Sequence, residues 1–362
     1  MRVALVSPVF WPEVRRGTER VARDLADGLL RRGHEPRLVT THPGARVARA
    51  VEDGLPVERW PRPLEGRLQR RLHEDHRTHV LTARLALARG ERPDVVHALH
   101  PTSGVAAVRA GRAPVVLGYM GIPHRQALVA RRGRLDLTLE AVRGAAAVVA
   151  LSRHAADAFG RWLGVRGVHV IAPGVDLGAF APGPAERAPA PTILCAADLA
   201  EPRKRVGLLV EAFARVRRER PDARLVLSRP TRDVPLPAAP GIEVRDLDDR
   251  AALAAANREA WVAALPSVGE AFGLVAAEAL ACGTPAVVSD AGALPEVVDR
   301  PEVGVRFAGD DAGDLARSLL AGLELAQDPG TAAACRARAS ELSVDRMVEA
   351  HLALYEDPWR RP

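Results

Sequence analysis

The sequence predicts an α/β protein built from two doubly wound domains, each a parallel sheet covered by helices. Short apolar runs alternate with segments of helical periodicity, and this alternation is typical of parallel sheets. It occurs twice, in residues 1–176 and again in residues 191–343. Between the two series, residues 173–191 are dense in Pro, Gly and Ala, so we place an interdomain linker at 177–190.

The first domain is expected to contain a helix over 18–34, where Val21, Leu25 and Leu29 recur every four residues. Helical or loop stretches separate its strand-like runs, which are 3–7, 36–40, 94–99, 113–120 and 145–152. The segment 344–362 has the pattern of an amphipathic helix. We expect this C-terminal helix to pack back on the first domain.

The second domain repeats the pattern, with a helix at 206–219. Its strand-like runs are 192–198, 223–228, 241–246, 260–267 and 286–290. Ligands of doubly wound sheets bind outside the carboxyl ends of the strands. We therefore expect the two domains to face each other across a ligand-binding cleft.

Composition excludes several other classes of protein. The chain has 362 residues, of which 48% are hydrophobic and 27% charged, as in ordinary soluble proteins. Cys195, Cys282 and Cys335 are far apart without a CxxC pair, which argues against a disulfide framework or a zinc cluster. No apolar run approaches the roughly 20 residues that span a bilayer, and the N-terminus does not resemble a signal peptide. These features predict a cytoplasmic protein.

The net charge of +6 comes almost entirely from arginine, because Lys204 is the only lysine in the chain. An ammonium group is a compact point charge that a planar guanidinium does not replace. Lys204, with Arg203 beside it, is therefore a candidate ligand for phosphate.

A strand at 261–265 leads through a short loop into an apolar helix at 271–282, which Gly283 and Pro285 end. Glu278 is the only charge of this helix. A helix that is apolar on every face is normally buried, and an unpaired buried carboxylate is costly. Glu278 therefore requires a functional explanation.

The start of this helix has the chemistry of an anion site. The helix is expected to begin near Ala271, and its tip offers the free backbone N–H groups of Phe272, Gly273 and Leu274. Gly273 allows a phosphate to approach the backbone closely. Glu270 lies beyond the phosphate and Glu278 about two turns further along, a spacing that fits a nucleotide sugar. The structural alternative is a helix with Glu270 as a cap and Glu278 exposed at one edge.

The same segment resembles the E-x7-E motif of the retaining glycosyltransferases of family 4, which have the GT-B fold. The matching residues are Glu270, Phe272, Gly273, Glu278, Ala279, Gly283, Pro285 and "GALPEVV" at 292–298. The resemblance extends through "FWPEVRRGTERVARDLADGLLRRGHE", "SRHAADAF", "PGVDLGAF" and "EPRKRVGLLVEAF". It implies that Glu270 contacts the donor sugar, the helix tip holds the diphosphate, and Glu278 contacts the nucleotide ribose.

The family usually has an Arg–Lys pair that neutralises the leaving diphosphate. Lys204 matches the lysine, but Asp198 stands at the arginine position, so Arg203 is expected to supply the missing charge. The pocket for the nucleotide base is expected around Ser228 and Arg229, together with the loop at 246–248.

Two further departures concern the first domain. In the family's Gly-Gly loop near the donor phosphates, Arg16 replaces the first glycine and Gly17 remains. Many relatives have a histidine near the transferred sugar where this chain has Met120, so Met120, Gly121 and His124 are the acceptor-side candidates. The resemblance implies that the leaving phosphate oxygens take the acceptor proton, while the protein supplies charge and position.

Three other patterns are interpreted as structural. "DLD" at 246–248 is expected to end a strand and cap a helix, so no metal is predicted. The histidines of 73–79 lack zinc-motif spacing, and we expect a solvated face there. With only 4% aromatics, the arginine-rich segments 64–92 and 125–134 favour contact with lipid headgroups over nucleic acid.

The sequence thus predicts a retaining, metal-independent glycosyltransferase without a cofactor, which moves a sugar from a UDP- or GDP-sugar to a hydroxyl group. Small molecules, lipid-linked carriers and glycans all fit as acceptors, and peripheral contact with the inner face of the membrane stays open. The alternatives are a nucleotide-sugar epimerase of the same fold and a non-catalytic nucleotide-sugar-binding protein, the latter suggested by Asp198 and Met120.

Overall fold

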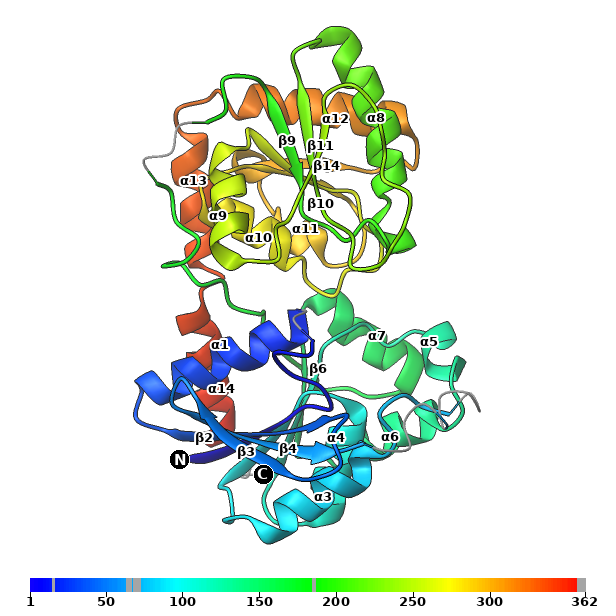
Figure 1. Ribbon diagram of the computed structural model, residues 1–362, viewed down its shortest axis with the longest axis vertical. Helices are drawn as coiled ribbons and strands as arrows, with labels where there is room; N and C mark the ends of the chain where they lie inside the picture. The colour runs from blue at the N-terminus through cyan, green and yellow to red at the C-terminus, as the bar shows by residue number, and fades with distance from the viewer. Residues whose placement is uncertain (15–16, 63–66, 68–72, 184–186, 357–362) are drawn as a thin grey trace. The chain divides into compact units, whose positions relative to one another are not determined.

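The structure, a computed structural model, consists of two compact units, each with a parallel sheet covered by helices (Figure 1). Unit 1 contains Met1–Gly174 and the C-terminal segment from Val344, and unit 2 contains Val175–Ser343. The described residues are 1–14, 17–62, 67, 73–183 and 187–356. The predicted doubly wound α/β class is confirmed in both units.

The sheet of unit 1 has the strand order β3-β4-β2-β1-β5-β6-β7-β8, in which only the β3–β4 pair is antiparallel among the described strands. The strands are β1 (Arg2–Val6), β2 (Glu35–His42), β3 (Ala48–Glu52), β4 (Leu55–Pro61), β5 (Val95–Ala98), β6 (Val115–Tyr119), β7 (Ala147–Ala150) and β8 (His169–Val170). Val3 of β1 is opposite Pro36 on one side and Val95 on the other. The chain therefore reverses its direction of strand addition between β1 and β5.

The β3–β4 hairpin at the edge of this sheet is not among the elements predicted from the sequence. Its outer strand β3 is largely exposed, and Val51 is 72% exposed. An edge strand that faces water lacks the buried apolar run on which the other predictions depended.

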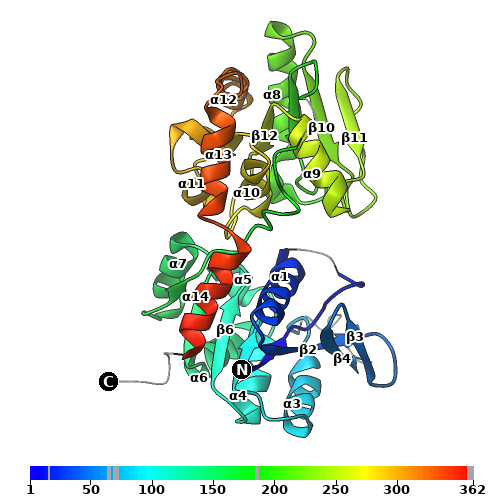
Figure 2. The ribbon, with the colours of Figure 1, turned by 90° about the vertical axis from the view of Figure 1, so that its left-hand side faces the viewer.

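The helices of unit 1 are α1 (Gly17–Arg31), α3 (His79–Arg89), α4 (Pro101–Ala110), α5 (Arg125–Val129), α6 (Arg134–Gly144), α7 (Arg153–Leu163) and α14 (Val344–Glu356). Helix α14 lies beside α1, although the two are far apart in sequence (Figure 2). Met347, Val348 and Leu354 of α14 are buried. The C-terminal helix therefore completes the hydrophobic core of unit 1.

Unit 2 contains a parallel sheet in the order β11-β10-β9-β12-β13-β14. Its strands are β9 (Thr192–Cys195), β10 (Arg224–Ser228), β11 (Ile242–Arg245), β12 (Val262–Leu265), β13 (Ala286–Ser289) and β14 (Gly304–Phe307). Its helices are η1 (Pro202–Lys204), α8 (Val206–Glu219), α9 (Arg250–Glu259), α10 (Leu274–Ala281), α11 (Leu294–Val297), η2 (Pro301–Val303), α12 (Ala312–Leu325) and α13 (Thr331–Ser340). The central strands β9, β12 and β13 are fully buried, as their continuous apolar runs require.

The segment that we interpreted as a linker, 177–190, belongs to unit 2 in its described residues. Phe180 is 1% exposed, and Arg336 of α13 donates hydrogen bonds to the carbonyl oxygens of Phe180 at 2.7 Å and Leu177 at 2.9 Å. In its described residues, this segment therefore packs on unit 2.

Candidate functional site

Strand order reverses in unit 2 between β9 and β12, and the carboxyl ends of such neighbouring strands form the usual ligand crevice of a doubly wound sheet. Helix η1 follows β9, and the loop 266–273 follows β12. The N–H of Val268 in this loop donates to the carbonyl oxygen of Arg203 at 2.9 Å. This bond fixes the two connections to each other at the switch point.

Glu270, Lys204 and Arg203 meet at this point. The Lys204 ammonium donates a hydrogen bond to Glu270 Oε1, and Arg203 Nη1 lies 3.2 Å from the same oxygen. Glu270 is 9% exposed. Burial alone would raise the pKa of Glu270, but the charges of Lys204 and Arg203 outweigh it and hold the pKa below its ordinary value. The structure thus brings together all three predicted catalytic residues.

Helix α10 begins at Leu274, three residues later than expected from Ala271. The reason is Gly273, whose φ of 112° is outside the helical region. A Cβ atom at position 273 would lie 2.6 Å from Leu294 Cδ2, so both the backbone and the space require glycine. No side chain caps α10, and its first N–H groups are left without helical acceptors. The tip is therefore suited to bind an anion.

Glu278 lies within α10 and is 2% exposed. The helix packs against α9, α13 and the strands β12 and β13, which explains its apolar sequence. The structural alternative, with Glu278 exposed at an edge and Glu270 as the helix cap, is wrong, because Glu278 is buried and the cap position is Gly273. A buried carboxylate thus lies within the helix whose tip is open to an anion.

The segment 292–298, noted in the sequence only as part of the family resemblance, supports Glu270 from behind, a role that was not predicted. The N–H of Ala293 donates to the Glu270 carbonyl oxygen at 3.0 Å. A Cβ atom at Gly292 would lie 2.9 Å from that oxygen, so a larger residue would displace the Glu270 backbone. The available signal was Gly292 in "AGALPEVV", three residues after the end of β13.

Ser228 and Arg229 lie at the carboxyl end of β10, next to β9, where Ser228 is buried and Arg229 exposed. Asp198 connects the loop that follows β9 to the loop that follows β10. Its Oδ2 accepts a hydrogen bond from Thr231 Oγ1 at 2.6 Å, and its Oδ1 accepts from the Ala200 N–H at 2.9 Å. Burial raises the pKa of Asp198, but these hydrogen bonds lower it by a larger amount. The pKa therefore lies below its ordinary value. Asp198 therefore fixes the loops that precede the glutamate–lysine cluster.

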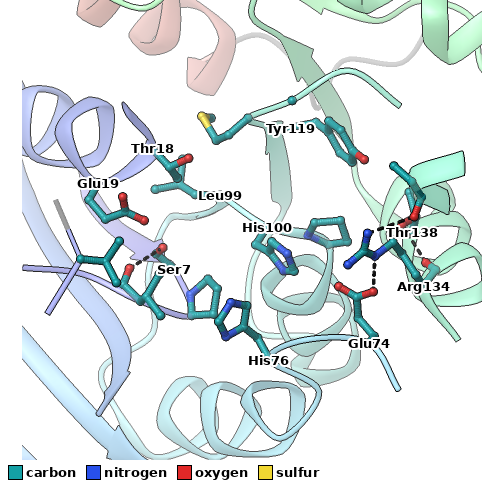
Figure 3. Close-up of a pocket in the computed structure, with 17 residues that line it drawn as sticks. Ser7, Thr18, Glu19, Glu74, His76, Leu99, His100, Tyr119, Arg134 and Thr138 are labelled. Carbon is teal, nitrogen blue, oxygen red and sulfur yellow. Dashed lines mark hydrogen bonds and ion pairs between the residues drawn. The ribbon is translucent and has the colours of Figure 1, made fainter. Parts of the chain in front are cut away.

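Unit 1 has a cavity of about 460 Å³ at the carboxyl ends of β1, β5 and β6, across its own switch point (Figure 3). The lining residues that follow these strands are Ser7, Leu99, His100, Met120 and Gly121. Of the acceptor-side candidates, Met120 and Gly121 line the cavity. His124 does not, because it is exposed and its Nδ1 caps α5 by accepting the Ala127 N–H at 3.2 Å.

One wall of the cavity carries an ion pair that joins two segments. Arg134 at the start of α6 donates from Nε to Glu74 Oε2, and from Nη1 to the Ala127 carbonyl oxygen at 3.0 Å. Burial raises the pKa of Glu74, and the hydrogen bond from Arg134 opposes this shift. The expected solvated face at 73–79 is wrong, since Glu74 is 3% and His79 1% exposed. Their burial depends on contacts with residues distant in sequence, which spacing does not reveal.

The predicted Gly-Gly loop is only partly described. Arg16 lies outside the described residues, and Gly17 is the first residue of α1. Glu19 in the first turn of α1 is 4% exposed and lines the cavity of unit 1 with Thr18. The contact of Arg16 and Gly17 with a donor stays a prediction.

The candidate metal patterns have structural roles. Asp246 Oδ1 accepts the Asp248 N–H at 3.2 Å, and Asp249 caps α9 by accepting the Ala252 N–H at 3.0 Å. Within the described residues, no group of three or more His, Cys, Asp or Glu side chains is placed to hold a metal ion. Nor does any helix in the described part of the chain combine the length and the apolar character needed to cross a membrane.

Two sequence families match this chain. The family described as "Glycosyltransferase Family 4" matches residues 15–179, and the one described as "Glycosyl transferases group 1" matches residues 190–324. The two matches correspond to the two units.

Among curated relatives, the D-inositol 3-phosphate glycosyltransferase of Kineococcus radiotolerans is 31% identical over 406 residues, which cover 94% of this chain and 90% of the relative. The protein of the same description from Mycobacterium sp. (strain KMS) is 35% identical over 172 residues, or 42% of this chain. The chain spans only 38% of the length of that relative and of two further Mycobacterium relatives.

Solved structures share the fold over nearly the whole chain. Sucrose-phosphate synthase from Thermosynechococcus elongatus has a TM-score of 0.80 at 21% identity, covering 98% of both chains. The Anabaena protein HepE in complex with UDP-glucose has a TM-score of 0.77 at 19% identity, covering 98% of this chain and 99% of that protein. At these identities the likeness shows the fold alone.

Proposed function

This chain belongs to glycosyltransferase family 4 and has the GT-B fold, and on that basis we propose that it transfers a sugar from a nucleotide-diphosphate donor to an acceptor hydroxyl. The observation that carries the proposal is the buried Glu270, held by Lys204 and Arg203 beside an uncapped helix tip. UDP-sugars and GDP-sugars are the donor candidates. The Anabaena protein HepE, whose structure contains UDP-glucose, supports a nucleotide sugar as the donor class.

In the proposed donor complex, the diphosphate lies at the N–H groups around Gly273 at the start of α10. Glu270 accepts hydrogen bonds from hydroxyls of the transferred sugar, and Glu278 binds the ribose. Ser228 and Arg229 border the base. The uncapped helix and the glycine that leaves room at its tip support this placement.

Cleavage of the bond between the sugar C1 and the phosphate oxygen places negative charge on the leaving diphosphate. Lys204 and Arg203 are positioned to stabilise that charge, which is larger in the transition state than in the bound donor. The acceptor oxygen then bonds to C1 on the same face, and its proton passes to an oxygen of the leaving phosphate. The configuration at C1 is retained, and the products are the glycosylated acceptor and a nucleoside diphosphate.

We assign the acceptor to the cavity of unit 1, which Met120 and Gly121 line. Its position at a strand switch point is the usual place for a small ligand in a doubly wound sheet. The three cysteines are free and buried, which supports a reducing compartment such as the cytoplasm.

The proposal is tested by incubating the protein with UDP-glucose or GDP-mannose and a panel of hydroxylated acceptors, and by measuring the release of UDP or GDP. Acceptor-dependent release identifies a transferase, whereas isomerised donor without release identifies an epimerase. Binding of UDP without any turnover identifies a non-catalytic binding protein and contradicts the proposal.

The proposed reaction uses no metal, because the cations at the diphosphate are side chains. Turnover is therefore expected to persist in EDTA at the same rate. Loss of turnover in EDTA that magnesium or manganese restores would contradict this part of the proposal.

A further inference from the structure

The cavity of unit 1 has few groups available to an anion. Arg134 is the only arginine or lysine among the described residues that line it, whereas Glu19 and Glu74 both contribute carboxylates (Figure 3). Among the described residues, Arg134 is therefore the arginine that a phosphate group in this cavity would meet.

Two of the five N–H donors of the Arg134 guanidinium are hydrogen-bonded to protein acceptors. Nε donates to Glu74, Nη1 donates to the Ala127 carbonyl oxygen at 3.0 Å, and Nη2 lies 3.7 Å from Asp75 Oδ2. All three nitrogens thus face an oxygen of the protein. A phosphate would have to displace Glu74 or lie beside it in a partly buried site, where like charges repel strongly.

The N-terminus of helix α4, a second common type of anion site, has two of its first N–H positions blocked. Helix α4 starts at the cavity, but its first residue is Pro101, which has no N–H to donate. The N–H of the next residue, Thr102, donates to His100 Nδ1 at 3.2 Å. Burial holds the pKa of His100 well below 6.5, so the ring adds no positive charge at neutral pH. This helix end therefore offers fewer open N–H groups than a helix N-terminus that binds phosphate through its whole first turn.

We infer that the acceptor is a small polyhydroxylated molecule without a phosphate group, an inference that rests on the proposed function. Three hydroxyl-bearing residues, Ser7, Thr18 and Tyr119, line the cavity. Together with the carboxylates of Glu19 and Glu74, they supply acceptors and donors for neutral hydroxyls. The volume of about 460 Å³ falls in the range of small-molecule sites, roughly 300–1,000 Å³.

This acceptor class differs from the phosphorylated acceptor named in the description of the relatives, which are D-inositol 3-phosphate glycosyltransferases. The difference gives a direct comparison of matched acceptors. Turnover is measured with myo-inositol against D-inositol 3-phosphate and with glucose against glucose 6-phosphate. The free polyol of each pair is expected to have at least a tenfold higher kcat/KM, and a preference for the phosphorylated member would overturn the inference.

A binding experiment tests the same inference without turnover. The protein is saturated with UDP so that the donor site is filled, and inorganic phosphate is titrated while the thermal midpoint is recorded. The wild type and Arg134→Gln are expected to respond equally, because Arg134 does not bind phosphate. A phosphate-dependent rise in the wild type that Arg134→Gln abolishes would overturn the inference.

The variant Glu74→Gln sharpens this experiment, since it frees Arg134 Nε from its carboxylate and should produce a phosphate-dependent rise. Glu140→Gln is the matched control. Glu140 is on α6, like Arg134, but outside the cavity, and its carboxylate accepts hydrogen bonds from Arg109 at 2.6 and 2.8 Å. Its removal should leave the phosphate response unchanged. An equal rise in both variants would show that the response does not arise at Arg134.

The two levels of the proposal fail in different ways. A protein that releases no nucleotide with any acceptor contradicts the proposed function, yet the phosphate titration still reports on the cavity. A protein that turns over phosphorylated acceptors preferentially supports the proposed function and contradicts only the inference about the acceptor.

Discussion

The two units differ in where their titratable residues are found. All eleven histidines belong to unit 1, whereas the single lysine and all three cysteines belong to unit 2. In unit 2 the charged site consists of residues that pair, such as Lys204 with Glu270. In unit 1 several histidines are buried in neutral form, such as His79 and His351. The units should therefore respond differently to mutation and to pH.

The largest expected effect is at Lys204. Lys204→Ala should lower kcat by about a hundred- to a thousandfold, which corresponds to an activation barrier higher by about 3–4 kcal/mol. The reason is that it removes the principal positive charge that stabilises the leaving diphosphate. Lys204→Arg should restore only part of the rate, because a planar guanidinium does not present the same point charge.

Arg205→Ala is the matched control for this prediction. It removes the adjacent cation, whose Nη2 pairs with Asp310 at 3.0 Å instead of with Glu270. Its kcat should stay within a few-fold of the wild type. Full activity of Lys204→Ala would show that Arg203 carries the charge stabilisation.

Acidification should destabilise unit 1 before unit 2. Burial lowers the pKa of His351 from 6.5 to about 4, so the unfolded chain binds more protons than the folded one in this window. Stability is therefore lost as the pH falls from 6.5 to about 4, by about 3 kcal/mol for this residue alone. The pKa of Glu270 in unit 2 lies below its ordinary value of 4.5, so the ionised carboxylate keeps its contribution to the stability of unit 2 until the pH falls below 4.5.

Calorimetric unfolding between pH 7 and pH 4.5 checks this comparison. His351→Phe should flatten the pH dependence of the unit 1 transition, because it removes a group that becomes protonated on unfolding. Substitution of the exposed His169 by Gln should leave the pH dependence as it is. An unchanged dependence in His351→Phe would assign the acid sensitivity to other groups.

The two glutamates of unit 2 should separate in a binding experiment. Glu278→Gln should weaken UDP binding by about 1.5–3 kcal/mol, the usual worth of a hydrogen bond to a charged group. Glu270→Gln should lower turnover and bind UDP at least as tightly as the wild type, because it frees Lys204 and Arg203 for the diphosphate. Isothermal titration with UDP measures both, and equal losses in the two variants would contradict the assigned roles.

The smallest effect is expected at Asp198. Asp198→Ala removes the hydrogen bonds to Thr231 and to the Ala200 N–H, and should cost about 1 kcal/mol of stability for each lost bond. UDP binding should weaken less than tenfold, since the loops border the donor site without forming the helix tip. Thermal unfolding with and without UDP measures this, and a loss of binding larger than that in Glu278→Gln would assign Asp198 a direct contact.

The geometry of the proposed donor site was largely predictable because its residues are close together in sequence. One short segment, the loop before α10 and the helix itself, contains Glu270, Gly273 and Glu278. Its other residues are mostly apolar, so the two glutamates are conspicuous in the sequence. Lys204 stood out by composition alone. The later start of α10 was not predictable from periodicity, because the apolar pattern does not reveal that Gly273 has a positive φ of 112°.

The cavity of unit 1 was only partly predictable, because the residues that line it are far apart in sequence. Met120 and Gly121 were placed by their position after a strand, but the Glu74–Arg134 pair joins residues sixty positions apart. The sequence around Glu74 is rich in charge and histidine, which favours a solvated face. Only the tertiary fold shows that this face is buried against α6.

The position of α14 also has a consequence for the order of folding. Unit 2 is one continuous stretch of chain, whereas the core of unit 1 is completed by α14, which follows unit 2 in the sequence. During synthesis from the N-terminus, unit 2 can therefore close its sheet while the α1 surface that receives Val348 is still uncovered. Unit 1, although it is synthesised first, can therefore complete its core only after α14 has left the ribosome.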